Sequence, residues 1–281
     1  MIIDTHAHIN FKTFDNDADE VIRRSLSRDV WIIIVGTDYK NSRRGLELAN
    51  KYEKGVYASI GLHPVHLEEG LIENQEQGYS FNSQAEIFNY DIYEKLAKFE
   101  KVVAIGETGL DYYHLNLDGN VAAVKRKQQE ILFKHLELGR ELNLPLIIHC
   151  RQAHDDMLAL IKDFRKKNKA VRSASGAWGV MHCFSGDEDL AWQYFSLGLL
   201  ISFNGMITFS KRWDDLIRKM PLEKLLVETD CPFLTPEPYR QMRNEPILVK
   251  QVISRIAEIR NLTPARVAEI TANNARGFFS I

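Results

Sequence analysis

Short apolar segments alternate with longer amphipathic segments along most of the chain. Most of the apolar segments lack polar interruptions, a pattern typical of strands that are buried on both faces. The amphipathic segments have the spacing of helices that bury one side. The apolar segments, which we predict to be strands, cover residues 1–8, 30–36, 56–61, 102–107, 144–149, 178–184, 199–204 and 225–230. The predicted helices cover residues 19–27, 42–52, 92–99, 121–142, 155–167, 188–195, 213–219, 246–260 and 263–278.

The repeated order of strand and helix predicts the fold class, an α/β protein built as a (β/α)8 TIM barrel. The length of 281 residues suits such a barrel, which takes roughly 250 residues. The rival, a doubly wound sheet, is disfavoured because the sequence contains neither GxGxxG nor GxxxxGKS, the glycine-rich phosphate turns of such sheets. We therefore expect a single domain over residues 1–281, with two loop insertions at residues 67–90 and 165–176.

Composition and charge narrow the classes of function. Hydrophobic residues make up 45% and charged residues 26% of the chain, which excludes wholesale disorder. The net charge of −2 disfavours long coating contacts with a duplex but permits a compact site that binds one or two phosphates. The longest apolar run, residues 30–35, is far below the roughly 18 residues of a membrane span. Because the chain opens on a predicted strand rather than a leader, we expect a cytoplasmic protein without membrane contacts, and a monomer.

Several predicted strands end in residue types that bind metal ions. On the first strand His6 and His8 alternate with Ala7, so both imidazoles project to the same side, the barrel interior. An isolated His-x-His pair is equally compatible with a structural role. Four further strands, however, end in the same class of residue, at the rim where barrel enzymes carry their chemistry. The predicted metal ligands are His6, His8, Glu107, His149, His182 and Asp230.

Six ligands are too many for one catalytic ion that must keep a position open, and they suit two ions that share a carboxylate. Glu107 is the natural bridge. The first ion takes His6, His8, Glu107 and Asp230, and the second takes Glu107, His149 and His182. Imidazole and carboxylate ligands fit zinc, manganese, iron or nickel, and magnesium also stays open. A water between the ions is acidified, and Asp230 accepts its proton as general base, so that Glu107 and Asp230 are the predicted catalytic residues.

Each of the three cysteines, Cys150, Cys183 and Cys231, directly follows a predicted ligand. Alternation along a strand predicts that their side chains point away from the barrel interior, toward the helices, where cysteine acts as a small buried hydrophobe. Thiolate ligation is the alternative. The odd count and the absence of a CxxC pair argue against a disulfide framework and a zinc ribbon.

Sequence motifs extend beyond these positions. They are DTHAH (residues 4–8), IGLHP (60–64), GETGLDY (106–112), IHCR (148–151), HCFSG (182–186), ETDCP (228–232), RNEP (243–246) and TANN (271–274). In this order they resemble the TatD family of metal-dependent deoxyribonucleases, and the resemblance covers the chain apart from the two insertions. It implies an amidohydrolase-type TIM barrel, a two-metal site on the six residues above, and phosphodiester hydrolysis, often 3′-to-5′ exonucleolytic.

The chain departs from the family pattern before RNEP. The family usually places Gly-Lys there, whereas this sequence has Gln241 and Met242, which removes a cation near the expected phosphate path. Two residues are predicted to bind substrate. His63 ends the third strand and faces a substrate phosphate or has a structural role. Arg243 precedes a predicted helix, where an anion site is plausible, and a salt bridge to Glu245 is the alternative. The insertion at residues 67–90 follows the third strand and should overhang the rim.

These features leave more than one function open. The leading hypothesis is a metal-dependent phosphodiesterase that acts on nucleic acid, DNA first and RNA second. The alternative keeps the site and changes the substrate to a small molecule or an ester, such as an aminoacyl-tRNA, because a barrel does not dictate chemistry. A third class is a binding scaffold whose metals are structural, and a complete ligand set on an accessible rim argues against it.

Overall fold

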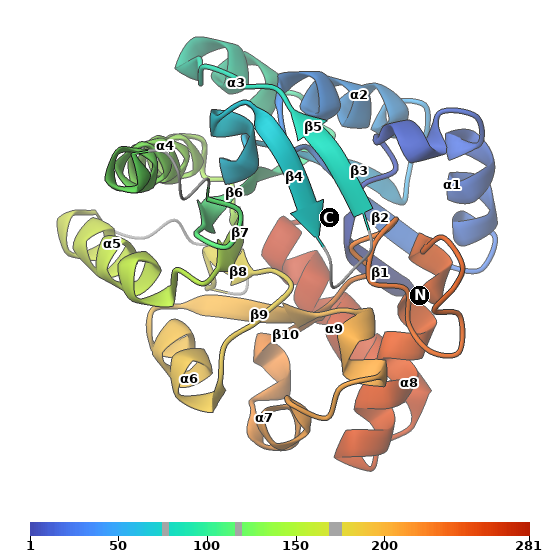
Figure 1. Cartoon of the computed structure of the whole chain (residues 1–281). Coiled ribbons are helices and arrows are strands. Elements are labelled where there is room, and N and C mark those ends of the chain that lie inside the picture. The colour runs from blue at the N-terminus through green and yellow to red at the C-terminus, as the bar shows by residue number, and fades with distance from the viewer. Residues whose placement is uncertain (75–78, 116–119, 169–175) are drawn as a thin grey trace.

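The computed structural model describes residues 1–74, 79–115, 120–168 and 176–281. Eight parallel strands form one sheet in the order β1-β2-β3-β6-β7-β8-β9-β10, and helices surround it (Figure 1). The strands are β1 (Ile2–Ala7), β2 (Val30–Val35), β3 (Val56–Ile60), β6 (Val102–Asp111), β7 (Leu146–Arg151), β8 (Gly179–Met181), β9 (Leu199–Phe203) and β10 (Leu225–Val227). A parallel bridge between Ala7 and Cys231 joins the two edges. The predicted (β/α)8 barrel is confirmed.

The helices lie on the outside of the barrel, and several begin at a side chain that caps the first turn. The carboxylate of Asp38 accepts from the Asn41 amide at 2.6 Å, and Asp187 accepts from Leu190 at 2.9 Å, which satisfies amides that lack a partner within the helix. The helices are α1 (Ala18–Leu26), α2 (Tyr39–Ala49), α3 (Tyr90–Ala97), α4 (Val121–Leu142), α5 (His154–Lys167), α6 (Glu188–Ser196), α7 (Asp214–Lys219), α8 (Val249–Arg260) and α9 (Pro264–Phe279). In the described part of the chain, no helix is both long and apolar enough to cross a bilayer.

The interior of the barrel is filled with apolar side chains at one end. Residues from the first halves of the strands, among them Ile3, Val103 and Leu226, pack in one buried cluster with Phe278 and Phe279 of α9. Side chains packed in this way leave no channel through the barrel. The opposite end, to which the strands point, is therefore the end where a site can open.

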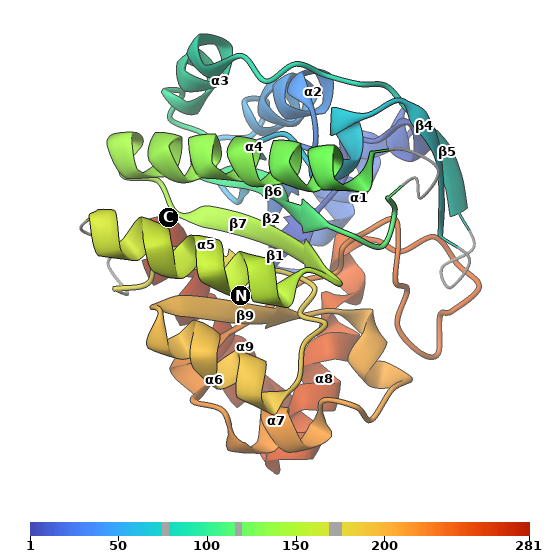
Figure 2. The same ribbon diagram turned by 60° about the vertical axis from the view of Figure 1, so that its left-hand side comes forward.

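The segment at residues 67–90 differs from the loop insertion that the sequence predicts. It contains two antiparallel strands, β4 (Gly70–Asn74) and β5 (Tyr79–Ser83). Figure 2 shows this hairpin at the end of the barrel toward which the strands point. The Ser83 hydroxyl donates to the Val65 carbonyl at 2.7 Å, and the Glu86 amide donates to the His66 carbonyl at 2.8 Å, so the hairpin base is tied to the segment after β3. Of the second predicted insertion, residues 165–176, positions 169–175 lie outside the described residues.

Strand β6 is longer than predicted and irregular where the chemistry lies. It runs to Asp111 rather than to Glu107, and its register against β7 shifts between Ile105 and Thr108. A shift of this kind re-aims side chains locally. Glu107 sits within the shifted stretch, and its amide donates to the Gly36 carbonyl of the segment after β2 at 2.8 Å. The extension of β6 then pairs Asp111 with Arg151 of β7.

Candidate metal centre and active site

A cavity of about 610 Å³ opens at the end of the barrel to which the strands point. Its walls come from segments far apart in the sequence, because the ends of parallel strands meet at one rim. Imidazoles, carboxylates and two guanidinium groups line it. These polar lining residues include His8, His63, Glu107, Asp111, His114, His149, Arg151, His154, His182, Arg212 and Asp230.

His6 and His8 form the first half of the centre, together with Asp230. The two Nε2 atoms lie 3.1 Å apart. His8 donates from Nδ1 to the Val35 carbonyl at 3.0 Å, so its Nε2 carries a lone pair that faces His6. Two imidazole nitrogens bound to one ion at about 2.0–2.1 Å lie roughly 3 Å apart when they are near a right angle. Asp230 Oδ1 is 3.4 Å from His8 Nε2 and 3.7 Å from His6 Nε2. These donors fit a divalent cation.

His149 and His182 form the second half, with one oxygen of Glu107 between them. Glu107 Oε1 lies 3.0 Å from His149 Nδ1 and 2.7 Å from His182 Nε2. One nitrogen of each ring therefore faces the same carboxylate oxygen, and the other nitrogen faces away. Two imidazole nitrogens and a carboxylate oxygen thus already converge on one point, so this donor set also fits a divalent ion.

Glu107 lies between the two halves. Its second oxygen, Oε2, is 3.3 Å from His6 Nε2 and 3.7 Å from His8 Nε2, so each oxygen faces one histidine pair, as a bridging ligand requires. Burial disfavours the charge of this carboxylate, but the imidazoles of His182, His63 and His6 hold its pKa well below the ordinary value. The structure thus brings the six predicted ligands together, and their role in binding metal stays a prediction.

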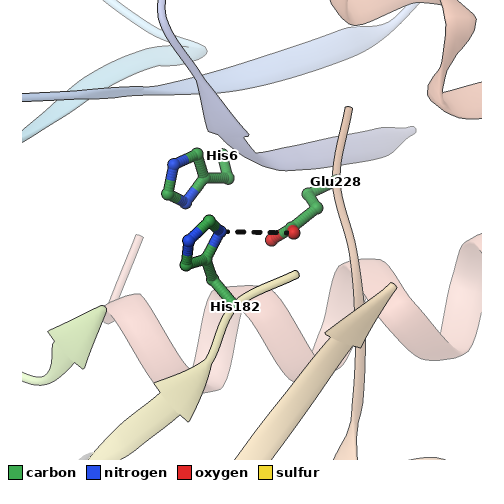
Figure 3. Close-up of side chains that lie close together, drawn as sticks. All are labelled: His6, His182 and Glu228. Carbon is green, nitrogen blue, oxygen red and sulfur yellow. Dashed lines mark ion pairs between the residues drawn. The ribbon is translucent and has the colours of Figure 1, made fainter. Parts of the chain in front are cut away.

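Two buried carboxylates that sequence reasoning did not assign lie behind the second half. Asp111 Oδ2 accepts from His149 Nε2 at 3.2 Å, and Glu228 Oε1 lies 3.5 Å from His182 Nδ1. Figure 3 shows Glu228 beside the His182 ring, which stacks on His6 with 3.9 Å between ring centroids. Both carboxylates stand in the sequence motifs GETGLDY and ETDCP. Their place in these motifs is the one feature of the sequence that points to them. Because the sequence predicts that the strand ends at Glu107, it does not place Asp111 on this strand.

His63 lines the cavity and also contacts Glu107. Its Nδ1 accepts from the Val65 amide at 3.2 Å, so the proton of the neutral ring sits on Nε2 and points to Glu107 Oε1 at 3.3 Å. Burial lowers the pKa of His63 to about 4. His63, Asp111 and His149 are close enough together to enclose an ion, but the protonated nitrogen of His63 makes this group a hydrogen-bonding network instead. His63 therefore presents an N–H donor at the rim.

The structure does not bring Arg243 to this centre. Its guanidinium pairs with Asp17 at 2.5 Å and with Glu245 at 3.0 Å, and it lies over the Phe14 ring at 4.3 Å. Arg243 lines an adjoining cavity of about 570 Å³. The salt-bridge alternative thus describes its contacts, and the predicted substrate-binding role stays a prediction with no contact to support it.

Two other arginines stand on the wall of the main cavity. Arg151 stacks over the Tyr113 ring, with 3.7 Å between the guanidinium carbon and the ring centroid. Arg212 donates to the Ser185 carbonyl at 2.8 Å. Sequence reasoning did not single out Arg212, because it follows a strand outside the ligand set and no local pattern distinguishes it from a solvated arginine.

The three cysteines differ in their place relative to the main cavity. Cys231 is fully buried and does not line the main cavity, whereas Cys183 lines it. Alternation no longer applies at Cys183, because β8 has already ended at Met181 and the φ of Cys183 is +45°. Cys150 reaches the cavity wall as well, and burial raises the pKa of its thiol to about 12. All three thiols are free.

Comparison with known proteins agrees with this geometry. A family model described as TatD related DNase matches residues 3–280. The chain is 36% identical over 284 residues to the uncharacterized metal-dependent hydrolase YabD of Bacillus subtilis, with 100% of both chains covered. It is 32% identical over 287 residues to the uncharacterized metal-dependent hydrolase YcfH of Escherichia coli, covering 100% of this chain and 96% of that protein.

Solved structures give the same result. The crystal structure of YjjV, a TatD homologue from Escherichia coli, is similar with a TM-score of 0.79 at 29% identity, and the match covers 100% of this chain and 98% of that one. A TatD family hydrolase from Entamoeba histolytica, at 23% identity and a TM-score of 0.78, covers 99% of this chain and 97% of that one and shows the shared fold. The family model, the relatives and the solved structures all match along nearly the whole chain. The protein therefore belongs to the TatD family.

Proposed function

We propose that this protein is a metal-dependent phosphodiesterase that degrades DNA, as a 3′-to-5′ exonuclease, with two divalent cations. The observation that carries the proposal is the position of Glu107, whose two oxygens face two separate sets of histidines in an open cavity. The description of the matching family as DNases supports the substrate class.

The residues divide between the two cations as follows. His6, His8 and Asp230 would hold the first ion, His149 and His182 would hold the second, and Glu107 would serve both. When bound, a pair of divalent ions acidifies a water and neutralises charge on a phosphodiester. Zinc, manganese and nickel suit this mixture of imidazole and carboxylate ligands, and magnesium suits it less well because it prefers oxygen.

Asp230 is placed to act on the attacking water. Its Oδ1 faces the two histidines of the first half, and a carboxylate has a second oxygen that can accept a proton while the first one ligates. Burial would favour the neutral acid, but the nearby imidazoles of His8, His6 and His182 lower the pKa of Asp230. Asp230 is therefore ionised at neutral pH and able to act as a general base.

Binding of the phosphate falls to donors on the cavity wall. His63 directs its Nε2–H toward the centre, and the guanidinium groups of Arg151 and Arg212 line the same cavity. The neutral N–H of His63 and the charged guanidinium groups can bind phosphate oxygens without reading the bases. With a net charge of −2, the protein has no excess of cations for a long duplex, which favours action on a short stretch of strand at an end.

A second candidate keeps the centre and changes the substrate to a small molecule or an ester, such as an aminoacyl-tRNA. The contacts of Arg243 favour this second candidate. Arg243 pairs with Asp17 and Glu245, so its charge is not available to bind the phosphates of a nucleic-acid strand. An ester hydrolase needs one activated water and no such path.

Labelled single-stranded and double-stranded DNA and RNA, tested with chelator and with metal added back, separate the two candidates. We expect stepwise release of nucleotides from the 3′ end of single-stranded DNA, abolished by chelator and restored by Mn²⁺ or Zn²⁺. His149→Ala serves as the matched control for a contaminating nuclease. If no oligonucleotide is turned over with any metal while an aminoacyl ester or a p-nitrophenyl ester is hydrolysed, the second candidate replaces the first.

A further inference from the structure

The two halves of the centre differ in what lies behind their imidazoles. In the second half, the outer nitrogen of each ring faces a buried carboxylate: Asp111 behind His149 at 3.2 Å and Glu228 behind His182 at 3.5 Å. In the first half, the outer nitrogen of His8 faces only the Val35 carbonyl. The outer nitrogens of His6 and His182 both lack a hydrogen-bond partner in the described part of the chain, but that of His182 has the Glu228 carboxylate within ion-pair distance.

Asp111 is held firmly in its place. Its Oδ1 accepts from the amides of Tyr113 and His114, both at 3.0 Å, and its Oδ2 also accepts from His114 Nδ1 at 2.7 Å. The side chain of Gln128 bonds both the amide and the carbonyl of Asp111, at 2.8 and 3.0 Å. With its side chain 1% exposed, this carboxylate has almost no freedom to move away from His149.

Glu228 is fixed in a similar way. Its Oε2 accepts from the Ser202 hydroxyl at 2.5 Å, and its Oε1 accepts from the Cys183 amide at 2.7 Å. Because Cys183 directly follows His182, the second bond pins the backbone that carries the ring. Figure 3 shows the carboxylate directed at the His182 ring. Glu228 therefore restrains the backbone beside His182 by a hydrogen bond and faces its ring as a charged neighbour.

A carboxylate behind a ligating histidine fixes the tautomer and orientation of the ring and raises its basicity, and loss of such a partner typically costs 10–100-fold in metal affinity. A backbone carbonyl supplies no negative charge. We propose that Asp111 and Glu228 are positioning residues for His149 and His182, and that they make the second half the tighter of the two cation sites. This inference rests on the two-cation centre of the proposed function.

Asp4 provides a matched control. It is a fully buried carboxylate in the same end of the barrel, but its oxygens accept from the amide and hydroxyl of Thr229, at 2.8 and 2.6 Å, and from the His6 amide. In the described structure its carboxylate thus bonds to backbone and hydroxyl groups rather than to an imidazole. Asp4→Asn changes a buried carboxyl group without removing the support of a ring in the second half.

The test is a calorimetric titration of the chelator-stripped protein with Zn²⁺. We expect two steps of unequal affinity, of which His149→Ala removes the tighter and His8→Ala the weaker. Asp111→Asn and Glu228→Gln should each weaken the tighter step by about 10–100-fold and leave the weaker step within about threefold. Asp4→Asn should leave the tighter step unchanged. Thermal unfolding of each metal-free variant shows whether it is folded, and Ser202→Ala replaces Glu228→Gln if that variant does not fold.

Two results would overturn the inference: a tighter step that survives both carboxylate variants unchanged, or a tighter step that disappears in His8→Ala. If the protein shows a single step, loss of that step in His149→Ala supports the inference and its survival refutes it. The titration contains no nucleic acid. A protein that binds zinc in this order but cleaves no oligonucleotide therefore refutes the proposed function and leaves the inference standing.

Discussion

The two halves of the centre are built from the same residue types but reach their geometry by different routes. His6 lies on β1 and His8 directly follows its last residue, so the local course of one segment sets their spacing. His149 and His182 come from the ends of β7 and β8, and they meet only because the register of the two strands brings them level. A local pattern therefore specifies the first half, while the second depends on the assembled barrel.

Electrostatics also separates the two halves. Burial lowers the pKa of His6. Burial acts in the same direction on His149 and His182, but the carboxylates of Asp111 and Glu107 raise the pKa of His149, and Glu107 and Glu228 hold that of His182 well above the ordinary value. The carboxylates around His149 and His182 thus favour a positive charge in the second half. Both halves have carboxylates in front of their rings, and we expect the additional carboxylates behind the rings to make the second half the better cation site.

Replacing Glu107 should have the largest effect, because this residue is common to both halves. In Glu107→Ala we expect elemental analysis to show loss of most of the metal, and activity to fall with it. Glu130→Ala, which removes an exposed carboxylate paired with Lys134 at 2.7 Å, is the control. Metal content that stays at the wild-type value in Glu107→Ala would refute the bridging role and leave two independent halves.

The barrel and the gathering of the six predicted ligands followed from the sequence. Strands buried on both faces leave an apolar pattern, and a polar residue at the end of such a strand is conspicuous. His149, His182 and Asp230 stand out for this reason. Since the ends of parallel strands share one rim, their proximity needs no knowledge of side-chain contacts.

The features that the sequence did not reveal depend on pairings between distant segments. The extension of β6 to Asp111 needs the register shift against β7, which no periodicity encodes. The strands β4 and β5 pair only with each other, and they lie in a segment that the sequence analysis treats as a loop insertion. Arg243 joins Asp17, 226 positions earlier, and a sequence pattern cannot tell that ion pair from an open anion site.

Asp230 differs from Glu107 in its expected role, because Asp230 is the proposed general base. Asp230→Asn keeps the shape and one ligating oxygen but loses the charge and the basicity. Because general-base help is worth about 10²–10⁴ in rate, we expect kcat on a single-stranded oligonucleotide to fall by at least that range, with a smaller change in KM. Steady-state kinetics at saturating Mn²⁺ measures both constants. A kcat near that of the wild type would remove Asp230 from the proton-transfer step.

The smallest effect concerns a buried histidine outside the centre. His135 is fully buried, donates from Nδ1 to the Ile131 carbonyl at 2.8 Å and accepts at Nε2 from the Leu62 amide at 3.1 Å. No carboxylate stands behind this ring in the described structure, and burial lowers its pKa to about 4. His135 is therefore a buried imidazole whose pKa no carboxylate raises, unlike those of His149 and His182 in the second half.

The sign of its effect on stability follows from proton linkage. Between pH 6.5 and 4 the unfolded chain protonates His135 and the folded chain does not. The contribution of His135 to the free energy of unfolding is therefore complete above the pKa of the unfolded state and decreases as the pH falls. By pH 5 this loss amounts to about 2 kcal/mol. In His135→Gln, whose amide can replace both hydrogen bonds, urea unfolding of the metal-free protein should lose about 2 kcal/mol less than the wild type between pH 7 and pH 5. Equal losses in the two proteins would show that His135 is protonated in the folded state, and that burial alone does not keep an imidazole neutral here.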